Sequence, residues 1–499
     1  MKKKTILTTI LAAVLGLGIT SCDMNLEPAG TLGDSNSLQT LSDAQNFRTG
    51  FYAALNSRVD GARVYYPEIQ TDIFHATSSY GNRGGLIYEW TFTSGDNDLQ
   101  AIFLEPYSAI KNLNFFINGS ISMDKTDWSS EDLAQLQVWR GEAFFLRAYY
   151  HMMLAELFCA DPIGNEDTYG IPYVTAYNPT SDQTQYPSRG TLGETYTRIF
   201  EDLDSAAAYI TTPGEAGSPY VTADAVLALR ARAALYTGDY ATAIRDAKAL
   251  VDSGLYPLVD NEDDFFEMWR NDSGAECILQ LWGDYENNSD SYDYGYIGYN
   301  VTEKRYTPDY IPEQWVLDLY DSNDLRWGQF YKDTVMTMTG NAEYPVTLLY
   351  KFMGNPEFTV GNEINYEHKA KPFRIAETYL ILAEAYARNG QAAEGSAVLN
   401  ELREARIPGY TGTTYSQSVL LEEVLEERVR ELIGEGFRFQ DIRRYDLGVS
   451  RGEAQVATAA LARNYNLSRT ATDPRFVWPI PQEEILSNPQ MAGQQNPGY

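Results

Sequence analysis

The sequence predicts a mostly α-helical protein, built as a tetratricopeptide-like scaffold of helical pairs with long loop-rich insertions that form the ligand-binding face. Residues 222–258 and 379–408 each carry the large, small and turn residues of a tetratricopeptide unit in the expected order. Residues 255–370 are instead rich in tyrosine, glycine, asparagine and aspartate and lack helical periodicity. We therefore expect helical pairs to frame a loop-rich middle part.

Small residues and turn residues carry the repeat signal. Ala231 and Ala383 let two antiparallel helices approach closely, and Gly238 and Gly390 stand at the turns between helices. The match is degenerate, since Gly395 replaces a commoner alanine. Helical pairs are expected at 140–158 with 191–210 and at 371–388 with 391–406.

The first 21 residues are predicted to form a lipoprotein signal peptide. Three lysines precede an apolar run that is shorter than the roughly 20 residues needed to span a bilayer. Ile19-Thr20-Ser21-Cys22 resembles a bacterial lipobox, so we expect Cys22 to carry acyl chains such as palmitate and to begin the mature protein. The alternative is ordinary secretory cleavage that leaves Cys22 as a free thiol. Polar residues 22–37 are expected to form a flexible tether.

The charge balance excludes some partners. Cleavage after residue 21 removes three lysines and no acids, so the formal charge moves from −31 to −34. An acidic body of this kind repels nucleic acid and anionic lipid surfaces. Cys159 and Cys277 lie in apolar surroundings, where two buried thiols are expected in preference to a disulfide.

Other elements are predicted from apolar spacing along the chain. Residues 38–56, 103–117 and 130–158 show the spacing of amphipathic helices, with Ser129 or Ser130 as the N-cap of the last. Residues 61–98 mix tyrosines with glycine, serine, asparagine and aspartate, and are expected to form a long loop or short strands.

The residue combinations of common catalytic and metal centres are absent from the mature chain. The three histidines are widely separated, and no HExxH, CxxC, GxSxG, GxxxxGK or GxGxxG motif occurs. We therefore expect no catalytic residue, no metal site and no cofactor. Two alternatives stay open: a glycosidase that uses two carboxylates such as Asp284 and Glu286, and a loose calcium site in the aspartate-rich loops.

Four segments of the mature chain form a specific pattern. The first is Phe145-Leu146-Arg147-Ala148-Tyr149-Tyr150, followed by Asp161-Pro162-Ile163. The second is residues 427–445, and the third is residues 478–485, which begin Trp478-Pro479-Ile480-Pro481. The fourth is Gln495-Asn496-Pro497-Gly498-Tyr499. Together with Leu26-Glu27-Pro28 they resemble the SusD/RagB family of nutrient-binding outer-membrane lipoproteins of Bacteroidetes.

The resemblance implies one SusD-like domain over residues 38–499, with a helical part (38–254), a loop-rich part (255–370) and a C-terminal part (371–499). It also implies a lipid-anchored protein on the surface of the outer membrane, which passes oligosaccharide to a SusC-like TonB-dependent transporter and is not an enzyme. Some branches of the family bind peptides, so a peptide-binding RagB-like protein is the alternative. A scaffold for protein interactions alone is a third interpretation.

Residues 427–445 are interpreted as structural. Val429, Leu432 and Ile433 can line a buried face together with Leu425, and Gly436 is expected to end the helix. The charged residues of the segment are expected to form ion pairs that hold the C-terminal part on the helical frame. In that prediction Glu431 or Glu435 is the partner of Arg438, Asp441 and Arg444.

Candidate ligand-binding residues come from two loops. Sugar rings stack their apolar faces on tryptophan and tyrosine, and their hydroxyls need amide or carboxylate partners. Residues 80–98 and 282–300 contain this mixture. The predicted ligand-binding residues are Tyr80, Trp90, Trp282, Tyr285, Tyr294 and Tyr296. The competing interpretation is that each ring packs against its own loop.

Overall fold

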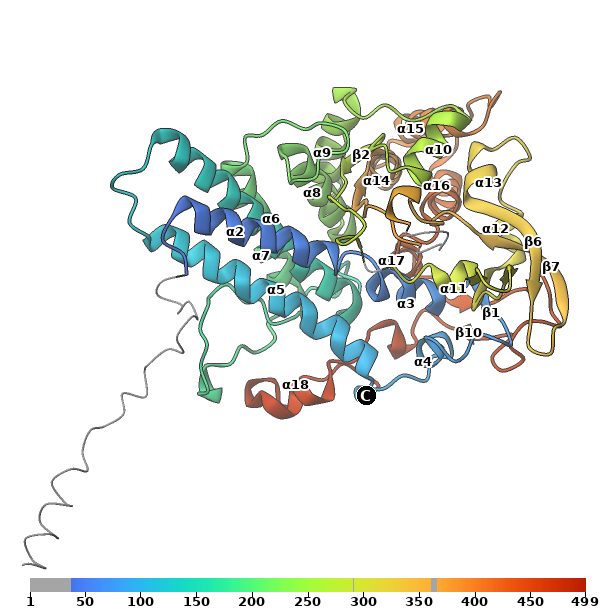
Figure 1. Cartoon of the computed structure of the whole chain (residues 1–499), viewed down its shortest axis with the longest axis horizontal. Coiled ribbons are helices and arrows are strands. Elements are labelled where there is room, and N and C mark those ends of the chain that lie inside the picture. The colour runs from blue at the N-terminus through green and yellow to red at the C-terminus, as the bar shows by residue number, and fades with distance from the viewer. Residues whose placement is uncertain (1–36, 290, 360–365) are drawn as a thin grey trace, which may run out of the picture.

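Pairs of helices form the frame of the molecule (Figure 1). This computed structural model describes residues 37–289, 291–359 and 366–499. Helices pack in chain order from α5 to α9, and α14 continues the array against α9. The frame consists of α2 (Leu41–Asn56), α5 (Asn97–Ser122), α6 (Ser130–Phe158), α7 (Leu192–Tyr209), α8 (Ala223–Thr237), α9 (Tyr240–Ser253), α14 (Ile375–Arg388), α15 (Ala392–Arg406) and α16 (Gln417–Leu432). The predicted α-helical, tetratricopeptide-like fold is confirmed.

Local sequence signals set the ends of these helices. The hydroxyl of Ser129 accepts a hydrogen bond from the amide of Asp132, and the carboxylate of Asp132 accepts one from the amide of Ser129. This capping box begins α6 at the predicted position. Gly238 ends α8 with a φ of +76°, a conformation that glycine adopts without strain.

Two glycines determine how closely neighbouring helices pack. A Cβ atom on Gly141 of α6 would lie 2.7 Å from Cγ1 of Ile210, which follows α7. A Cβ atom on Gly395 of α15 would lie 2.8 Å from both the carbonyl oxygen of Ala383 and Cδ2 of Leu420. The departure from alanine at position 395 therefore has a physical reason, because α14, α15 and α16 meet too closely for a methyl group.

The prediction of a loop or short strands for residues 61–98 was wrong for its first part. The segment contains α3 (Ala62–Gln70), β1 (Phe74–Ala76) and α4 (Gly85–Tyr88). Tyr65 and Ile69, one helical turn apart, are buried in the core, although α3 contains Pro67. Tertiary packing of this face therefore outweighs the poor local helix propensity.

Short strands and small helices are distributed through the loop-rich part and the segments that pack against it. The antiparallel pairs are β1 with β5 (Tyr310–Pro312), β2 (Cys277–Leu279) with β8 (Phe373–Arg374), and β9 (Val449–Ser450) with β10 (Ser468–Arg469). A mixed sheet has the order β3-β4-β6-β7, formed by Tyr299–Asn300, Arg305–Tyr306, Tyr331–Thr337 and Glu343–Leu349. The remaining α-helices are α10 (Glu262–Arg270), α11 (Tyr294–Ile297), α12 (Gln314–Leu317), α13 (Leu325–Phe330), α17 (Arg438–Arg444) and α18 (Gln482–Ser487).

The signature segment 427–445 has different ion-pair partners from those predicted. Helix α16 ends at Leu432, and Gly434 and Gly436 both have positive φ and turn the chain into α17. This turn carries Arg438 to Asp72, at 2.7 Å, and away from Glu431 and Glu435.

The other two predicted pairings are corrected for the same reason. Arg444 binds Glu384 of α14 at 2.6 Å, and Asp441 binds Arg428 at 2.7 Å. Glu431 is instead surrounded by three buried arginines from other elements, which are Arg326, Arg374 and Arg406. The segment thus ties together α3, α14 and the loop-rich part through buried charges.

The two cysteines of the body are free and buried. Burial raises the pKa of the Cys159 thiol to about 11 and that of Cys277 to about 12. The prediction of two buried thiols is confirmed. Cys22, the signal peptide and the tether up to residue 36 lie outside the described residues. Within the described ranges, none of the helices combines the length and apolar character needed to cross a bilayer.

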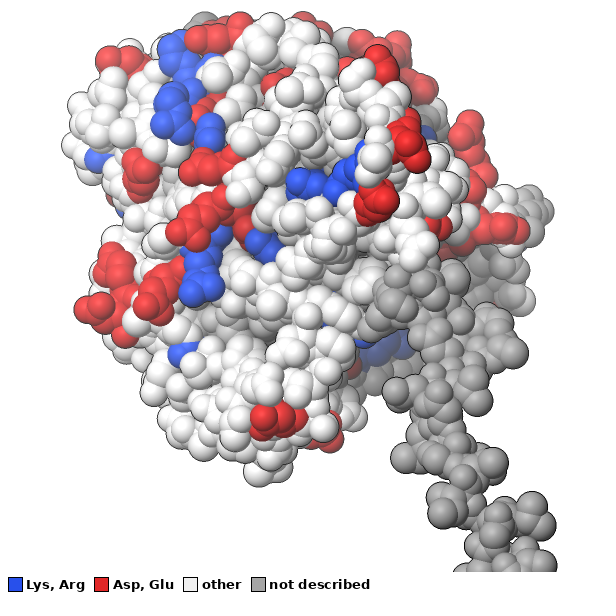
Figure 2. Space-filling view, turned by 90° about the vertical axis from the view of Figure 1, so that its left-hand side faces the viewer, with Lys and Arg blue, Asp and Glu red and all other residues white. Residues whose placement is uncertain are grey.

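Acidic and basic side chains both occur on the face of the molecule that Figure 2 shows. This view shows the left-hand side of Figure 1, and acidic and basic side chains alternate there with wide areas that carry neither. On this face the net negative charge is therefore spread out.

Candidate functional site

The segment 282–299, without residue 290, runs past the C-terminal end of α2 and along α3. We call it the aromatic segment, because it holds Trp282, Tyr285, Tyr292, Tyr294, Tyr296 and Tyr299. Its first carbonyl, at Trp282, accepts a hydrogen bond of 3.4 Å from the side chain of Asn56 at the end of α2. Further along, the hydroxyl of Ser289 donates to the carbonyl of His368 at 2.9 Å.

Two rings of the aromatic segment face solvent. Trp282 is 57% exposed and Tyr285 is 53% exposed, among the most exposed large apolar side chains of the described chain. A tight turn fixes their backbone, since the carboxylate of Asp284 accepts hydrogen bonds from the amides of Glu286 and Asn287 at 2.9 and 2.7 Å. The turn holds the exposed Tyr285 beside Asp284.

A second group of rings forms where the aromatic segment meets α3 and the 80–98 loop. Tyr292 and Tyr294 are half-buried, with ring centres 5.8 Å apart, and Tyr292 also packs on Tyr66 of α3. The guanidinium of Arg83 lies 5.6 Å from the ring centre of Tyr294 and forms an ion pair with Asp309. The two loops from which ligand residues were predicted are therefore brought together.

A groove of about 110 Å³ lies beside this group, between the end of α2, α3 and α5. Tyr66 and Tyr292 line it together with the acidic side chains of Asp60, Asp98 and Glu105. The hydroxyl of Tyr66 donates to Asp98 at 3.0 Å, and burial followed by the charge of Asp98 raises the pKa of Tyr66 above its usual value. Rings next to hydrogen-bond acceptors are the chemistry that a sugar ring requires.

Three of the six predicted ligand-binding residues are buried, and for these the competing interpretation fits the structure. Trp90 is 1% exposed, and its indole nitrogen donates to the carbonyl of Gln70 at 2.8 Å. Tyr296 is 2% exposed and stacks on Phe74 at 4.7 Å. Tyr80 is buried and donates to Asn82 at 2.9 Å. These rings support the loops from inside, which leaves them no face for a ligand.

Sequence reasoning missed four residues that the structure places around the half-buried Tyr294: Tyr66, Arg83, Asp98 and Tyr292. Tyr292 belongs to the same alternating tyrosine series as Tyr294 and Tyr296, and that series was the available signal. The alternation does not tell which ring faces outward, because α11 turns Tyr296 into the core while Tyr294 stays half-buried.

A buried histidine connects the aromatic segment to the frame. Nε2 of His368 lies 3.3 Å from Asp293 in the aromatic segment and 3.5 Å from Asp60 in the turn between α2 and α3. Burial by itself would lower the pKa of His368, but the hydrogen bond to Asp293 and the charge of Asp60 raise it to about 8. The protonated imidazole therefore holds two carboxylates from different elements.

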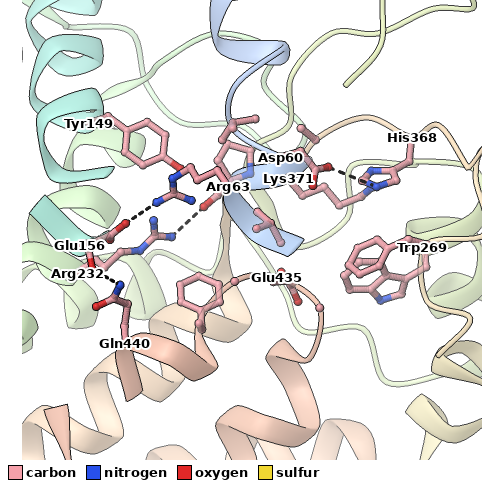
Figure 3. Close-up of a pocket in the computed structure, with 18 of the residues that line it drawn as sticks. Asp60, Arg63, Tyr149, Glu156, Arg232, Trp269, His368, Lys371, Glu435 and Gln440 are labelled. Carbon is pink, nitrogen blue, oxygen red and sulfur yellow. Dashed lines mark hydrogen bonds and ion pairs between the residues drawn. The ribbon is translucent and has the colours of Figure 1, made fainter. Parts of the chain in front are cut away.

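A neighbouring pocket of about 70 Å³ shares Asp60 and Arg63 with the groove (Figure 3). Its charged groups have partners: Arg63 pairs with Glu156, and Arg232 pairs with Glu377 at 2.6 Å. The volume is enough for a few water molecules only. Within the described ranges, no group of three or more histidine, cysteine, aspartate or glutamate side chains is arranged to hold a metal ion.

Comparisons with known proteins identify the family. A model described as "SusD family" matches residues 287–499, and one described as "Starch-binding associating with outer membrane" matches residues 36–235. Together they account for most of the chain. The chain belongs to the SusD family.

Individual relatives agree in length and fold. A SusD-like protein of Formosa agariphila is 23% identical, and the starch-binding protein SusD of Bacteroides thetaiotaomicron is 26% identical, with 99% or more of each chain covered in both cases. A SusD superfamily structure from Bacteroides thetaiotaomicron has a TM-score of 0.79 at 26% identity, covering 92% of this chain and 100% of its own. A putative sugar-binding protein of Bacteroides vulgatus has the same fold, with a TM-score of 0.77 at 22% identity and coverage of 93% and 100%.

Proposed function

We propose that this protein is a lipid-anchored receptor on the surface of the outer membrane that binds oligosaccharide and delivers it to a SusC-like TonB-dependent transporter. The ligand is held and released without chemical change. The contact residues in this proposal are the exposed or half-exposed rings of the aromatic segment, Trp282, Tyr285 and Tyr294, with Tyr292 and Arg83 beside them.

The observation that supports the proposal most strongly is the exposure of Trp282 and Tyr285 on a backbone that hydrogen bonds hold in place. When a sugar ring stacks on an exposed tryptophan, apolar surface of both is removed from water. Because hydrogen bonds already order the loop, binding costs little conformational entropy. The carboxylates of the neighbouring groove can accept hydrogen bonds from sugar hydroxyls. Membership of the SusD family and the description of the matching model as starch-binding agree with this ligand class.

Affinity gels that contain soluble polysaccharides test the proposal. We expect the mature protein to be retarded by at least one glycan, and we expect Trp282→Ala, Tyr285→Ala and Tyr294→Ala each to weaken binding by about tenfold, as the loss of one stacked ring implies. Tyr169→Ala is the matched control, because Tyr169 is 44% exposed but lies in the segment before α7.

The outcomes separate the competing functions. Retention of peptides, with no retardation by any glycan, would favour a peptide-binding RagB-like protein. Release of reducing sugar by the purified protein would favour a glycosidase. Equal binding by Tyr169→Ala and Trp282→Ala would show that the aromatic segment is not the contact surface.

Membrane anchoring has its own test. With Cys22 acylated, two or more buried chains would hold the protein on the membrane stably. Cys22→Ala should then release the protein into the soluble fraction and remove labelling by radioactive palmitate. Continued membrane association of Cys22→Ala would contradict the lipid anchor.

A further inference from the structure

The charges around the aromatic segment determine which class of glycan it can bind, if the segment is the contact surface assigned under the proposed function. Arg83 is the basic side chain among the proposed contact residues. Its Nε and Nη2 both donate to the carboxylate of Asp309, whose side chain is 1% exposed. A buried carboxylate therefore balances the charge of Arg83, and the half of the guanidinium that faces solvent is a hydrogen-bond donor with little net charge.

Carboxylates exceed basic groups in the turn that holds the two exposed rings. Asp284 and Glu286 lie within this turn, and Glu286 is exposed. Glu367 adds a third carboxylate, which accepts a hydrogen bond of 2.6 Å from the side chain of Asn288. Lys369 packs against the same turn and supplies a positive charge. Among these described residues, three carboxylates thus lie near one ammonium group.

Some charged side chains of the neighbouring groove already have a partner of opposite charge. Arg63 forms an ion pair with Glu156, and Asp60 lies 3.5 Å from the protonated imidazole of His368 (Figure 3). The same imidazole also lies 3.3 Å from Asp293. Two carboxylates therefore share one imidazolium, which leaves this group with an excess of negative charge.

The other charged side chains that line the groove are Asp98, Glu105 and Arg58. Asp98 and Glu105 are exposed. Arg58 is half-buried, and its guanidinium donates to the backbone carbonyls of Ala54 and Glu105 at 2.9 and 3.1 Å. The carboxylates of the groove therefore face solvent, while the donors of its arginine are largely occupied by the backbone.

We propose that the aromatic segment selects oligosaccharides that carry no carboxylate or sulfate group and does not bind anionic glycans. Two like charges in contact in water weaken an affinity by about fivefold, and salt limits their repulsion to about 8 Å under physiological conditions. A sugar on Trp282 or Tyr285 lies this close to Asp284 and Glu286, because all four belong to one short turn. Sugar hydroxyls, by contrast, can donate hydrogen bonds to these carboxylates.

Affinity gels with two sets of soluble polysaccharides test this selectivity. The uncharged set is starch, galactomannan and laminarin, and the anionic set is polygalacturonate, alginate and chondroitin sulfate. We expect every glycan that retards the mature protein at physiological ionic strength to belong to the uncharged set. An anionic glycan that retards the protein at least as strongly would overturn the selectivity and leave the proposed function intact. No retardation by either set would overturn both.

A matched pair of ligands isolates the effect of charge. An uncharged glycan that retards the protein is compared with a sample of the same glycan in which some primary hydroxyls at C6 have been oxidised to carboxylates. We expect oxidation to weaken binding about tenfold or more at low salt, and much less in about 1 M salt, where charges are screened within about 3 Å. Equal weakening at both salt concentrations would contradict repulsion by the carboxylates.

Charge variants of the protein identify the groups responsible. Glu286→Gln and Glu105→Gln each remove one negative charge and preserve the size of the side chain. We expect each to raise the affinity for the oxidised glycan, relative to that for the uncharged glycan, by about threefold to fivefold. Glu394→Gln is the matched control, because Glu394 is exposed on α15 and lies in neither the turn nor the groove lining. An affinity ratio that stays constant in both site variants, or that changes equally in Glu394→Gln, would overturn the proposal.

Discussion

Glu384 of α14 shows how this protein keeps charges in its interior. The side chain is fully buried, and its carboxylate accepts hydrogen bonds from Arg444 at 2.6 and 3.0 Å and from Arg388 at 2.7 Å. Burial by itself would raise the pKa of Glu384, but the two arginines outweigh it and lower the pKa to about 2. The C-terminal α17 is thereby fixed to the helical frame.

A pH dependence of stability follows from this pair. Because the pKa of Glu384 in the folded protein is below its usual value of 4.5, its contribution is complete above about pH 4.5 and is lost as the pH falls towards 2. We expect Glu384→Gln to lower the free energy of unfolding at neutral pH by about 3 kcal/mol and to reduce the acid-side loss of stability. Urea denaturation at several pH values measures both effects.

The matched control for this prediction is Glu394→Gln, since Glu394 is exposed on the neighbouring α15. This variant should change the free energy of unfolding by less than about 0.5 kcal/mol. Equal destabilisation by the two substitutions would show that the buried pair is not responsible.

At the scale of elements, the contact between α6 and α7 depends on the absence of a side chain at Gly141. We expect Gly141→Ala to lower the free energy of unfolding by about 1 to 3 kcal/mol, because its methyl group would overlap Ile210. Gly328→Ala in α13 is the control, since a Cβ atom there meets no atom within 4 Å. Chemical denaturation measures both variants, and an unchanged stability of Gly141→Ala would show that the helices can separate without cost.

The attachment of the aromatic segment through His368 predicts a second pH dependence. The pKa of His368 is raised, so its stabilising contribution is complete below about pH 6.5 and is lost as the pH rises through about 8. We expect the protection factors of the amides of residues 291–299, which are corrected for base-catalysed exchange, to fall when the pH is raised above 8, and glycan affinity to fall with them. The His368→Gln variant should lose this dependence, and an identical pH profile in both proteins would contradict the role of His368.

For the whole molecule, one hydrophobic core runs through all three parts of the chain. Most buried apolar side chains from Leu38 to Met491 form one contiguous cluster, which includes residues of the helical, loop-rich and C-terminal parts. A small second cluster lies around Met336 and Leu348 of the β6–β7 hairpin. Trp478 of the C-terminal part is fully buried, and its indole nitrogen donates to the side chain of Gln70 at 2.8 Å. The parts are therefore not packed as separate bodies.

The predicted single domain over residues 38–499 can be tested by calorimetry. A shared core gives cooperative unfolding, so we expect one thermal transition whose calorimetric and van't Hoff enthalpies agree. Two resolved transitions, or a fragment 38–254 that melts cooperatively by itself, would contradict a single domain.

The sequence by itself determined the helical frame, because local and periodic signals specify it. Apolar spacing located α6 and the pairs α8 with α9 and α14 with α15. Ser129, one of the two predicted N-cap residues, begins α6, and Gly238 ends α8. The helix of residues 62–70 escaped prediction, since packing of Tyr65 and Ile69 stabilises it more than its own residues do.

The tertiary structure decided the rest, namely ion-pair partners and the direction of each aromatic ring. Arg438 pairs with Asp72, which follows α3, and Arg444 pairs with Glu384 of α14. Both partners are distant in sequence from the arginines. Trp90 and Trp282 look alike in sequence, yet one is 1% and the other 57% exposed. Loops have no periodicity that marks an inner and an outer face, so only the packing of distant segments determines which ring can meet a ligand.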